Sequence, residues 1–244
     1  MTQGRIEWLS PADPPEAFPD VSRALTEPDG LLAAGGDLSP ERLLAAYARG
    51  IFPWFEQGQP ILWWSPDPRC VLRPDRLHVA RRLRQQLRNS RVELRFNTAF
   101  GDVIRRCAGK RRSQQGTWIT GDMVAAYEHL HREGWAHSIE AWEDTELVGG
   151  LYGLCIGKVF FGESMFSGKP NTSKMALLGL TRHMLSTGLE ILDCQVSSSH
   201  LFTLGAALMP RRDFSKFLAA ACNPPEPHRA WPAEAVPVSS LFIA

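Results

Sequence analysis

The sequence contains no run of about 18 consecutive apolar residues, the length that a transmembrane helix requires. The first eight residues also lack the apolar core of a secretory signal peptide. We therefore expect a cytoplasmic protein that has no membrane partner. The chain has 244 residues, of which 44% are hydrophobic and 22% charged. This is enough for one large domain, or for a small domain joined to a larger one.

Cysteine pairs and metal-binding motifs are absent as well. The sequence has no C-x-x-C spacing, and its five cysteines are Cys70, Cys107, Cys155, Cys194 and Cys222. An odd, scattered set is typical of reduced thiols rather than of a disulfide framework or a zinc site. The seven histidines form no H-E-x-x-H motif, and His129 and His131 have a poor spacing for two ligands on one helix.

The charge is unevenly distributed along the chain. The net charge is only +1, but residues 69–112 contain 14 Arg and Lys against three acids, a local charge of +11. The remaining 13 basic and 23 acidic residues carry −10. A local field of this size predicts a polyanionic partner such as RNA, DNA or an acidic surface. A solvated basic face without a function is the alternative.

The N-terminal region has the signals of a small domain. Ser39 is expected to cap a helix whose first residue is Pro40 and which ends at Gly50. The Ser-Pro-Asp-Pro sequence at 65–68 is typical of a linker. We therefore expect one domain at residues 1–66 and a second at residues 67–244.

Aromatic residues are concentrated in this first region. Phe52 and Phe55 are expected in its core. Trp63 and Trp64 are adjacent, so on a strand they face opposite ways, and one of them is expected to face solvent or a ligand. Trp118 lies just before the predicted helix cap Thr120, where an indole can be a stacking platform or a core residue.

The second region predicts helices and strands in mixed order. The expected helices cover 78–88, 100–108, 120–134, 175–187 and 200–205, and the expected strands cover 92–97, 137–142, 147–156, 159–163 and 189–196. A last strand–helix unit begins at 209. The proline-rich first 20 residues and the tail after Cys222 are expected to be irregular. This order predicts an α+β fold with mixed strand directions.

The helix predicted at 78–88 is amphipathic. Its apolar face consists of Val79, Ala80, Leu83 and Leu87. The opposite face carries Arg81, Arg84 and Arg88, with Arg82 at its flank. A ridge of guanidinium groups can bind phosphates along a groove, and such binding depends steeply on salt.

Three polar residues interrupt otherwise apolar strands. Glu163 ends the strand predicted from Val159, where an unpaired carboxylate is costly. It therefore needs a cationic ligand or a partner in the protein, which can be its own loop. Asp193 and Gln195 are two residues apart on a strand, so their side chains are expected to point the same way. With Glu163 they predict a polar site in an apolar pocket, or else a buried pair that stabilises the core.

Six motifs extend over most of residues 25–217. They are GLLAAGGDL at 30–38, RGIFPWF at 49–55, LWWSPDPR at 62–69, GTWIT at 116–120, FGESMFS at 161–167 and DCQV at 193–196. Through these motifs the chain resembles the leucyl/phenylalanyl-tRNA–protein transferase family.

The resemblance implies a small N-terminal α/β domain followed by an acetyltransferase-like (GNAT) domain with a mixed sheet. It implies an enzyme that moves Leu or Phe, and less well Met, from aminoacyl-tRNA to the N-terminal α-amino group of proteins beginning with Arg or Lys. The product is a degradation signal, an N-degron. No cofactor or metal is implied, because the aminoacyl ester is already activated, and a monomer is expected. Residues 168–173 replace the Q/R-x-x-G-x-G/A loop that would bind the pyrophosphate of acetyl-CoA.

The resemblance also assigns roles to individual residues. Trp54 and Trp118 match residues that sandwich the terminal adenosine of the tRNA, where stacking is worth ~1–3 kcal/mol per base. Glu163 would bind the cationic N-terminal residue, and Asp193 and Gln195 would orient the acceptor amine or help to deprotonate it. The pocket for the aminoacyl side chain would be lined by Leu151, Phe160, Leu177, Leu180 and Leu192. The tRNA backbone would be bound by Arg81, Arg82, Arg84 and Arg88.

Two other functions are compatible with parts of the sequence. An N-acyltransferase that uses acyl-CoA would transfer from a thioester without RNA. A non-enzymatic RNA-binding module would account for the basic segment, but not for Glu163, Asp193 and Gln195.

Overall fold

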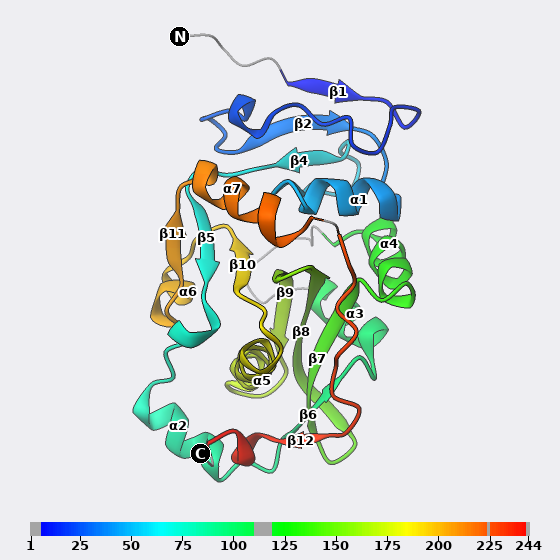
Figure 1. The fold of residues 1–244 in the computed structure, drawn as a ribbon. Helices are drawn as coiled ribbons and strands as arrows, with labels where there is room; N and C mark the ends of the chain where they lie inside the picture. The colour runs from blue at the N-terminus through cyan, green and yellow to red at the C-terminus, as the bar shows by residue number, and fades with distance from the viewer. Residues whose placement is uncertain (1–5, 110–118, 224, 243–244) are drawn as a thin grey trace.

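A computed structural model of the chain describes residues 6–109, 119–223 and 225–242 (Figure 1). The described residues form two sheets and seven α-helices. The smaller sheet has the strand order β1-β2-β4-β3, and its strands are β1 (Glu7–Leu9), β2 (Leu31–Gly35), β3 (Phe52–Pro53) and β4 (Leu62–Trp64). β1 pairs with β2 in parallel, and the other pairs are antiparallel. The irregular lead-in predicted for residues 1–20 is therefore wrong at β1, whose backbone groups are paired by β2.

The first helix and the aromatic residues of this sheet follow the local sequence signals. α1 (Pro40–Tyr47) begins after Ser39 with proline in its first turn, as predicted, but it ends at Tyr47 rather than at Gly50, and the Ser39 side chain makes no capping hydrogen bond. Trp63 is fully buried and donates its indole N–H to the Gly35 carbonyl at 2.9 Å. Trp64 is only partly buried, and its indole N–H reaches the Trp54 carbonyl at 2.7 Å. The prediction that the two tryptophans face opposite ways is confirmed.

The larger sheet has the strand order β11-β5-β10-β9-β8-β7-β6-β12. Its strands are β5 (Arg69–Leu72), β6 (Glu93–Phe96), β7 (Ala136–Glu143), β8 (Glu146–Ile156), β9 (Val159–Ser167), β10 (Ile191–Gln195), β11 (Ala207–Met209) and β12 (Val236–Pro237). Only β9 and β10 pair in parallel, and the other neighbours in this sheet are antiparallel. The predicted α+β class with mixed strand directions is confirmed.

Helices cover both faces of this sheet. They are α2 (Arg81–Arg88), α3 (Phe100–Ala108), α4 (Gly121–Arg132), α5 (Thr172–Thr187), α6 (Ser199–Thr203) and α7 (Arg211–Ala221). The alternation of side chains along β9 separates two cores: Phe160 packs with α5, and Phe161 packs with α3, α4 and α7. Figure 1 shows α1 and α7 lying between the small sheet and the large one. None of the described helices is both long and apolar enough to cross a membrane.

Several predicted boundaries differ from the structure, and three of these differences have a clear physical cause. β9 does not end at Glu163 but continues to Ser167, because the long strand β8 pairs with it as far as Gly149. α2 begins at Arg81 rather than at 78, because the backbone of Ala80 is extended, with a ψ of 144°, and the first helical bond runs from the Arg84 N–H to the Ala80 carbonyl. The tail is not wholly irregular, because β12 adds an edge strand to β6.

The tail is also held by stacked aromatic rings. Trp231 stacks on His137 of β7 and on His183 of α5, with ring centroids 4.3 and 4.4 Å apart. Burial lowers the pKa of His137 to about 3 and that of His183 to about 4. The tail is thus docked against neutral imidazole rings.

Candidate active site

The site lies where the parallel strands β9 and β10 separate. Their pairing ends at Phe161 opposite Asp193, although both strands continue beyond this pair. Each strand then contains a bulge. On β9, Gly162 and Ser164 face consecutive residues of β8, so Glu163 is the extra residue. On β10, the register against β5 shifts between Asp193 and Gln195, and Gln195 has a φ of 62°.

A bulge redirects side chains that strict alternation would place elsewhere. These two bulges face each other across the separated strands and bring the Gln195 Nε2 atom to 2.8 Å from the Glu163 Oε1 atom. The irregular geometry of the two strands is therefore what assembles the polar part of the site.

An adjoining cavity of about 580 Å³ supplies the apolar part. Its wall includes all five residues expected in an aminoacyl side-chain pocket, namely Leu151, Phe160, Leu177, Leu180 and Leu192. They come from β8, β9, α5 and β10 and are all buried. Glu163, Asp193 and Gln195 line the same cavity. The arrangement can hold an apolar side chain beside a carboxylate and an amide.

Glu163 is held by donors from three other elements. The Tyr47 hydroxyl of α1 donates to it at 2.6 Å, and the Tyr127 hydroxyl of α4 at 2.9 Å. The Gln195 amide is the third donor. The two tyrosine hydroxyl oxygens are also in contact with each other, and because each hydroxyl has one proton, the two protons are shared among three contacts when Glu163 is ionised. Glu163 is therefore bonded to distant partners rather than to its own loop.

Burial dominates the protonation of this group. It raises the pKa of Glu163 to about 7, even though the bonds from Tyr47, Tyr127 and Gln195 favour the ionised form. Burial and the nearby carboxylate also raise the pKa of both tyrosines well above the ordinary value, so their hydroxyl protons stay in place. Among the described residues no cation pairs with Glu163. These residues therefore give its ionised form no counter-charge.

Asp193 has a different environment. The Arg69 guanidinium binds both of its oxygens, with Nε at 2.8 Å and Nη2 at 2.6 Å. Arg69 is 1% exposed and Asp193 is fully buried. Asp193 also accepts the backbone N–H of Gln195 at 2.9 Å, so it stabilises the turn that aims Gln195 at Glu163. Because Arg69 binds both carboxylate oxygens, Asp193 is suited to positioning other groups.

Arg69 in turn connects the two sheets. Its third nitrogen donates to the Gly50 carbonyl at 3.0 Å, and its guanidinium lies about 5 Å from the ring centroids of Phe52 and Phe214. No role was predicted for Arg69, Tyr47 or Tyr127. Arg69 belongs to the LWWSPDPR motif, which was the one available signal. The two tyrosines carried no sign beyond their place on predicted helices.

Of the two residues predicted to stack on a base, one is among the described residues. Trp54 lies at the rim of the cavity, is 43% exposed and packs against Trp64 with ring centroids 5.6 Å apart. Its indole face is thus available to a flat ligand. Trp118 lies outside the described residues.

The predicted phosphate-binding arginines do not line the cavity. Arg81, Arg82, Arg84 and Arg88 are exposed on α2, whereas Leu87 of the same helix is buried. Figure 1 shows α2 at the end of the molecule opposite the small sheet. The structure therefore separates a basic surface from the apolar cavity.

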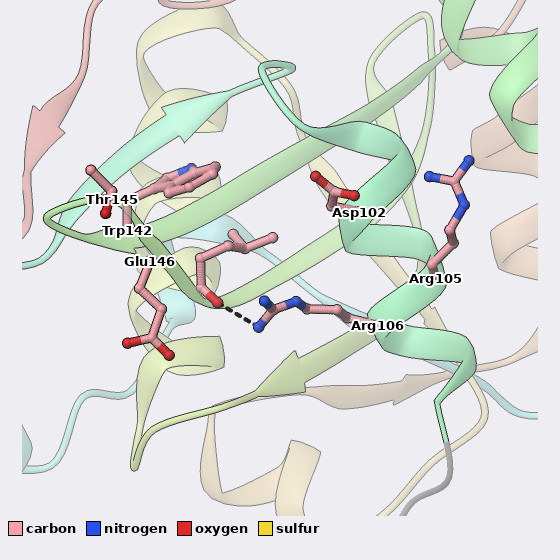
Figure 2. Close-up of a pocket in the computed structure, with 7 residues that line it drawn as sticks. Asp102, Arg105, Arg106, Trp142, Thr145 and Glu146 are labelled. Carbon is pink, nitrogen blue, oxygen red and sulfur yellow. Dashed lines mark hydrogen bonds between the residues drawn. The ribbon is translucent and has the colours of Figure 1, made fainter.

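A second hollow of about 670 Å³ lies between α3 and the β7–β8 turn (Figure 2). Asp102, Arg106, Trp142 and Glu146 are among its lining residues. Arg106 donates to the Leu147 carbonyl at 2.7 Å, as Figure 2 shows. None of the predicted site residues lines this hollow.

Comparison with known proteins gives a consistent result. The family described as "Leucyl/phenylalanyl-tRNA protein transferase" matches residues 71–219, and the N-terminal domain of the same description matches residues 36–67. A leucyl/phenylalanyl-tRNA–protein transferase from Nitrosomonas eutropha is 54% identical over 214 residues, covering 88% of this chain and 92% of the relative. One from Chromobacterium violaceum is 52% identical, covering 93% and 96%.

Solved structures add little to this comparison. A conserved protein of unknown function from Staphylococcus epidermidis aligns over 74% of this chain and 68% of its own, at 10% identity. Its TM-score of 0.38 is too low to support an argument about the fold.

Proposed function

The chain belongs to the leucyl/phenylalanyl-tRNA–protein transferase family, and on that premise we propose the reaction that its cavity performs. The enzyme moves leucine or phenylalanine, and less well methionine, from aminoacyl-tRNA to the α-amino group of proteins that begin with Arg or Lys. The product carries an N-degron. One observation carries this proposal: an apolar cavity contains a half-buried carboxylate that has only neutral hydrogen-bond donors among the described residues.

Glu163 binds the acceptor. A guanidinium or ammonium group at the N-terminus of the acceptor protein supplies the counter-charge that the ionised carboxylate lacks. Charge-assisted hydrogen bonds of this kind are about twice as strong as neutral ones. The tyrosine hydroxyls of Tyr47 and Tyr127 hold the carboxylate in place without neutralising it. Asp193 cannot substitute for it, because Arg69 already neutralises that charge.

The apolar wall and Trp54 bind the donor. The five wall residues enclose a Leu or Phe side chain, and fit in such a pocket discriminates only by ~1–3 kcal/mol per methylene, so several apolar side chains are accepted. The exposed face of Trp54 stacks on the terminal adenosine, with Trp118 as the expected second platform.

Gln195 and Asp193 prepare the attack. The Gln195 amide donates to Glu163 through Nε2, and its Oε1 atom can accept a hydrogen bond from the acceptor amine. Asp193 keeps Gln195 in this position through the backbone bond at 2.9 Å. The amine nitrogen then forms a bond to the ester carbonyl carbon. The ester C–O bond breaks, and the ribose leaves as a hydroxyl with the proton that the amine loses.

The arginines of α2 extend the donor site along the tRNA. Phosphate contacts fix the orientation of a nucleic acid without reading its sequence. The exposed guanidinium groups of this helix are suited to that role, and they lie in the segment of charge +11.

We also propose the domain division at residues 1–66 and 67–244, with a GNAT-like second domain and a monomeric enzyme. The division is supported by the change of sheet between β4 and β5. The GNAT assignment is supported by a central parallel pair that separates at the ligand cavity.

The test is transfer of labelled leucine from Leu-tRNA to two peptides, one beginning with Arg and one with Ala. We expect the wild-type enzyme to transfer leucine to the Arg peptide alone. The Glu163→Gln variant should lose this transfer and still bind tRNA. Glu190→Gln is the matched control, because this exposed glutamate pairs with Lys158 and does not line the cavity. Equal transfer to both peptides, or acetyl transfer from acetyl-CoA in place of leucyl transfer, would contradict the proposal.

A further inference from the structure

Two cysteines face each other next to Gln195. On β10, Asp193 is opposite Val71 of β5, and the next aligned pair is Gln195 opposite Cys70. Cys194 is the inserted residue of the bulge, so Cys194 and Gln195 together oppose Cys70. The two thiols interact with each other, and the Cys194 S–H also reaches the Leu192 carbonyl at 3.9 Å. Cys70 is directly opposite Gln195, and the Cα atoms of such a pair are about 4.5–5.5 Å apart, so the adjacent Cys194 lies at the same point of the ladder as Cys70.

This pair differs from the other described cysteines. Cys194 lines the active-site cavity and is only partly buried, so a small oxidant that enters the cavity can reach it. Cys155 and Cys222 are buried and do not line the cavity, and burial raises the pKa of both thiols, that of Cys222 to about 12. At the pair, in contrast, the interaction between the two thiols lowers the pKa of Cys70 and raises that of Cys194, so Cys70 is the better thiolate and Cys194 the more exposed sulfur.

We propose that Cys70 and Cys194 are an oxidation site of this enzyme, at which a peroxide joins β5 to β10 through a reversible disulfide. One sulfur, as a thiolate, attacks a peroxide oxygen. The O–O bond breaks, and the departing oxygen leaves as water, so the sulfur becomes a sulfenic acid. The second sulfur attacks this sulfenic sulfur, the S–S bond forms, and a second water leaves. Two electrons pass from the sulfurs to hydrogen peroxide, and an external thiol reverses the step.

The disulfide acts on the machinery that aims Gln195, an effect on activity that rests on the proposed function. Sulfur atoms in a disulfide are about 2.0 Å apart, closer than two hydrogen-bonded thiols. The bond fixes the Cβ–Cβ distance of the pair, and it thereby ties the β10 bulge between Asp193 and Gln195 to the β5 segment that carries Arg69. Misplacement of a catalytic group by about 1 Å can cost about 100-fold in rate. We therefore expect oxidation to reduce leucyl transfer by about 10- to 100-fold while tRNA binding stays unchanged.

The experiment treats the full-length folded protein with graded hydrogen peroxide, blocks the remaining thiols with iodoacetamide, and maps peptides by mass spectrometry without reduction. We expect one cross-linked species that joins the Cys70 and Cys194 peptides, has lost two hydrogen atoms, and is reversed by dithiothreitol. Cys70→Ala should abolish the cross-link and leave Cys194 as a sulfenic or more oxidised acid. Cys222→Ala is the matched control and should leave the cross-link intact.

The mass measurement does not depend on activity, so the two proposals can fail separately. Oxidation of Cys194 without a bond to Cys70 in the native protein would overturn the oxidation site. Formation of the disulfide with unchanged leucyl transfer would overturn its coupling to the active site. A reduced protein that forms the cross-link on oxidation but never transfers leucine would refute the proposed function and leave the oxidation site standing.

Discussion

The protonation of Glu163 leads to a sharp prediction about acceptor use. A carboxylate that binds a cationic N-terminus must be ionised, yet burial raises the pKa of Glu163 to about 7. With that pKa, roughly a tenth of the free enzyme is ionised at about pH 6 and roughly nine tenths at about pH 8. Since kcat/KM reports the ionisation of the free enzyme, its dependence on Glu163 should increase about ninefold over this range.

The assay compares the wild-type enzyme with Glu163→Gln on an Arg-terminated peptide at saturating Leu-tRNA. The acceptor amine also titrates in this range, but it does so equally for both enzymes. The ratio of their kcat/KM values therefore isolates Glu163, and we expect it to rise about ninefold with a midpoint near pH 7. The Glu190→Gln control should give a ratio to wild type that does not change with pH.

The raised pKa of Glu163 also makes stability depend on pH, in the opposite direction to acceptor use. The native state holds the Glu163 proton more tightly than the unfolded chain does, so the free energy of unfolding should fall as the pH rises from about 4.5 to about 7. The shift corresponds to at most about 3 kcal/mol. Glu163→Gln removes this contribution, and thermal melts across the range measure it. A flat kcat/KM ratio, together with parallel melting curves for both proteins, would refute the reasoning.

Three further predictions concern the tRNA contacts and the tail. Trp54→Ala should weaken aminoacyl-tRNA binding by about 5- to 150-fold, the equivalent of ~1–3 kcal/mol of stacking. Trp8→Ala, which removes another exposed indole, is the control. Equal dissociation constants for the two variants would contradict the prediction. The slope of log Kd against log salt should flatten by about two to three when glutamine replaces Arg81, Arg84 and Arg88. An unchanged slope would exclude α2 from the tRNA site. Because burial holds the pKa of His137 at about 3 and that of His183 at about 4, the stability of the docked tail is fully present above about pH 6.5. Below that pH the free energy of unfolding should fall by up to ~1.4 kcal/mol per pH unit for each histidine. Thermal melts of a His183→Phe variant test this, and the same acid dependence as in the wild type would be evidence against it.

Most of the secondary structure was predictable because its causes are local. α3 covers Phe100–Ala108, the range that was predicted for it. Thr120 caps α4 by accepting the Met123 N–H, as its position before the helix predicted. Both signals depend on residues within one or two helical turns. The tail strand β12 escaped prediction because its pairing partner β6 lies more than a hundred residues earlier in the chain.

The active site was predictable to the same extent, from local features but not from long-range contacts. The sequence by itself determined that a lone acid and a polar pair interrupt apolar strands, and the family resemblance pointed to apolar residues that line the cavity. Only the tertiary structure decided how these groups meet. Glu163 is bonded to Tyr47, 116 residues away, and Asp193 to Arg69, 124 residues away. Alternation along a strand could not place Gln195, because its direction depends on two bulges whose registers are set by neighbouring strands. Residue spacing within one strand carries no information about those registers.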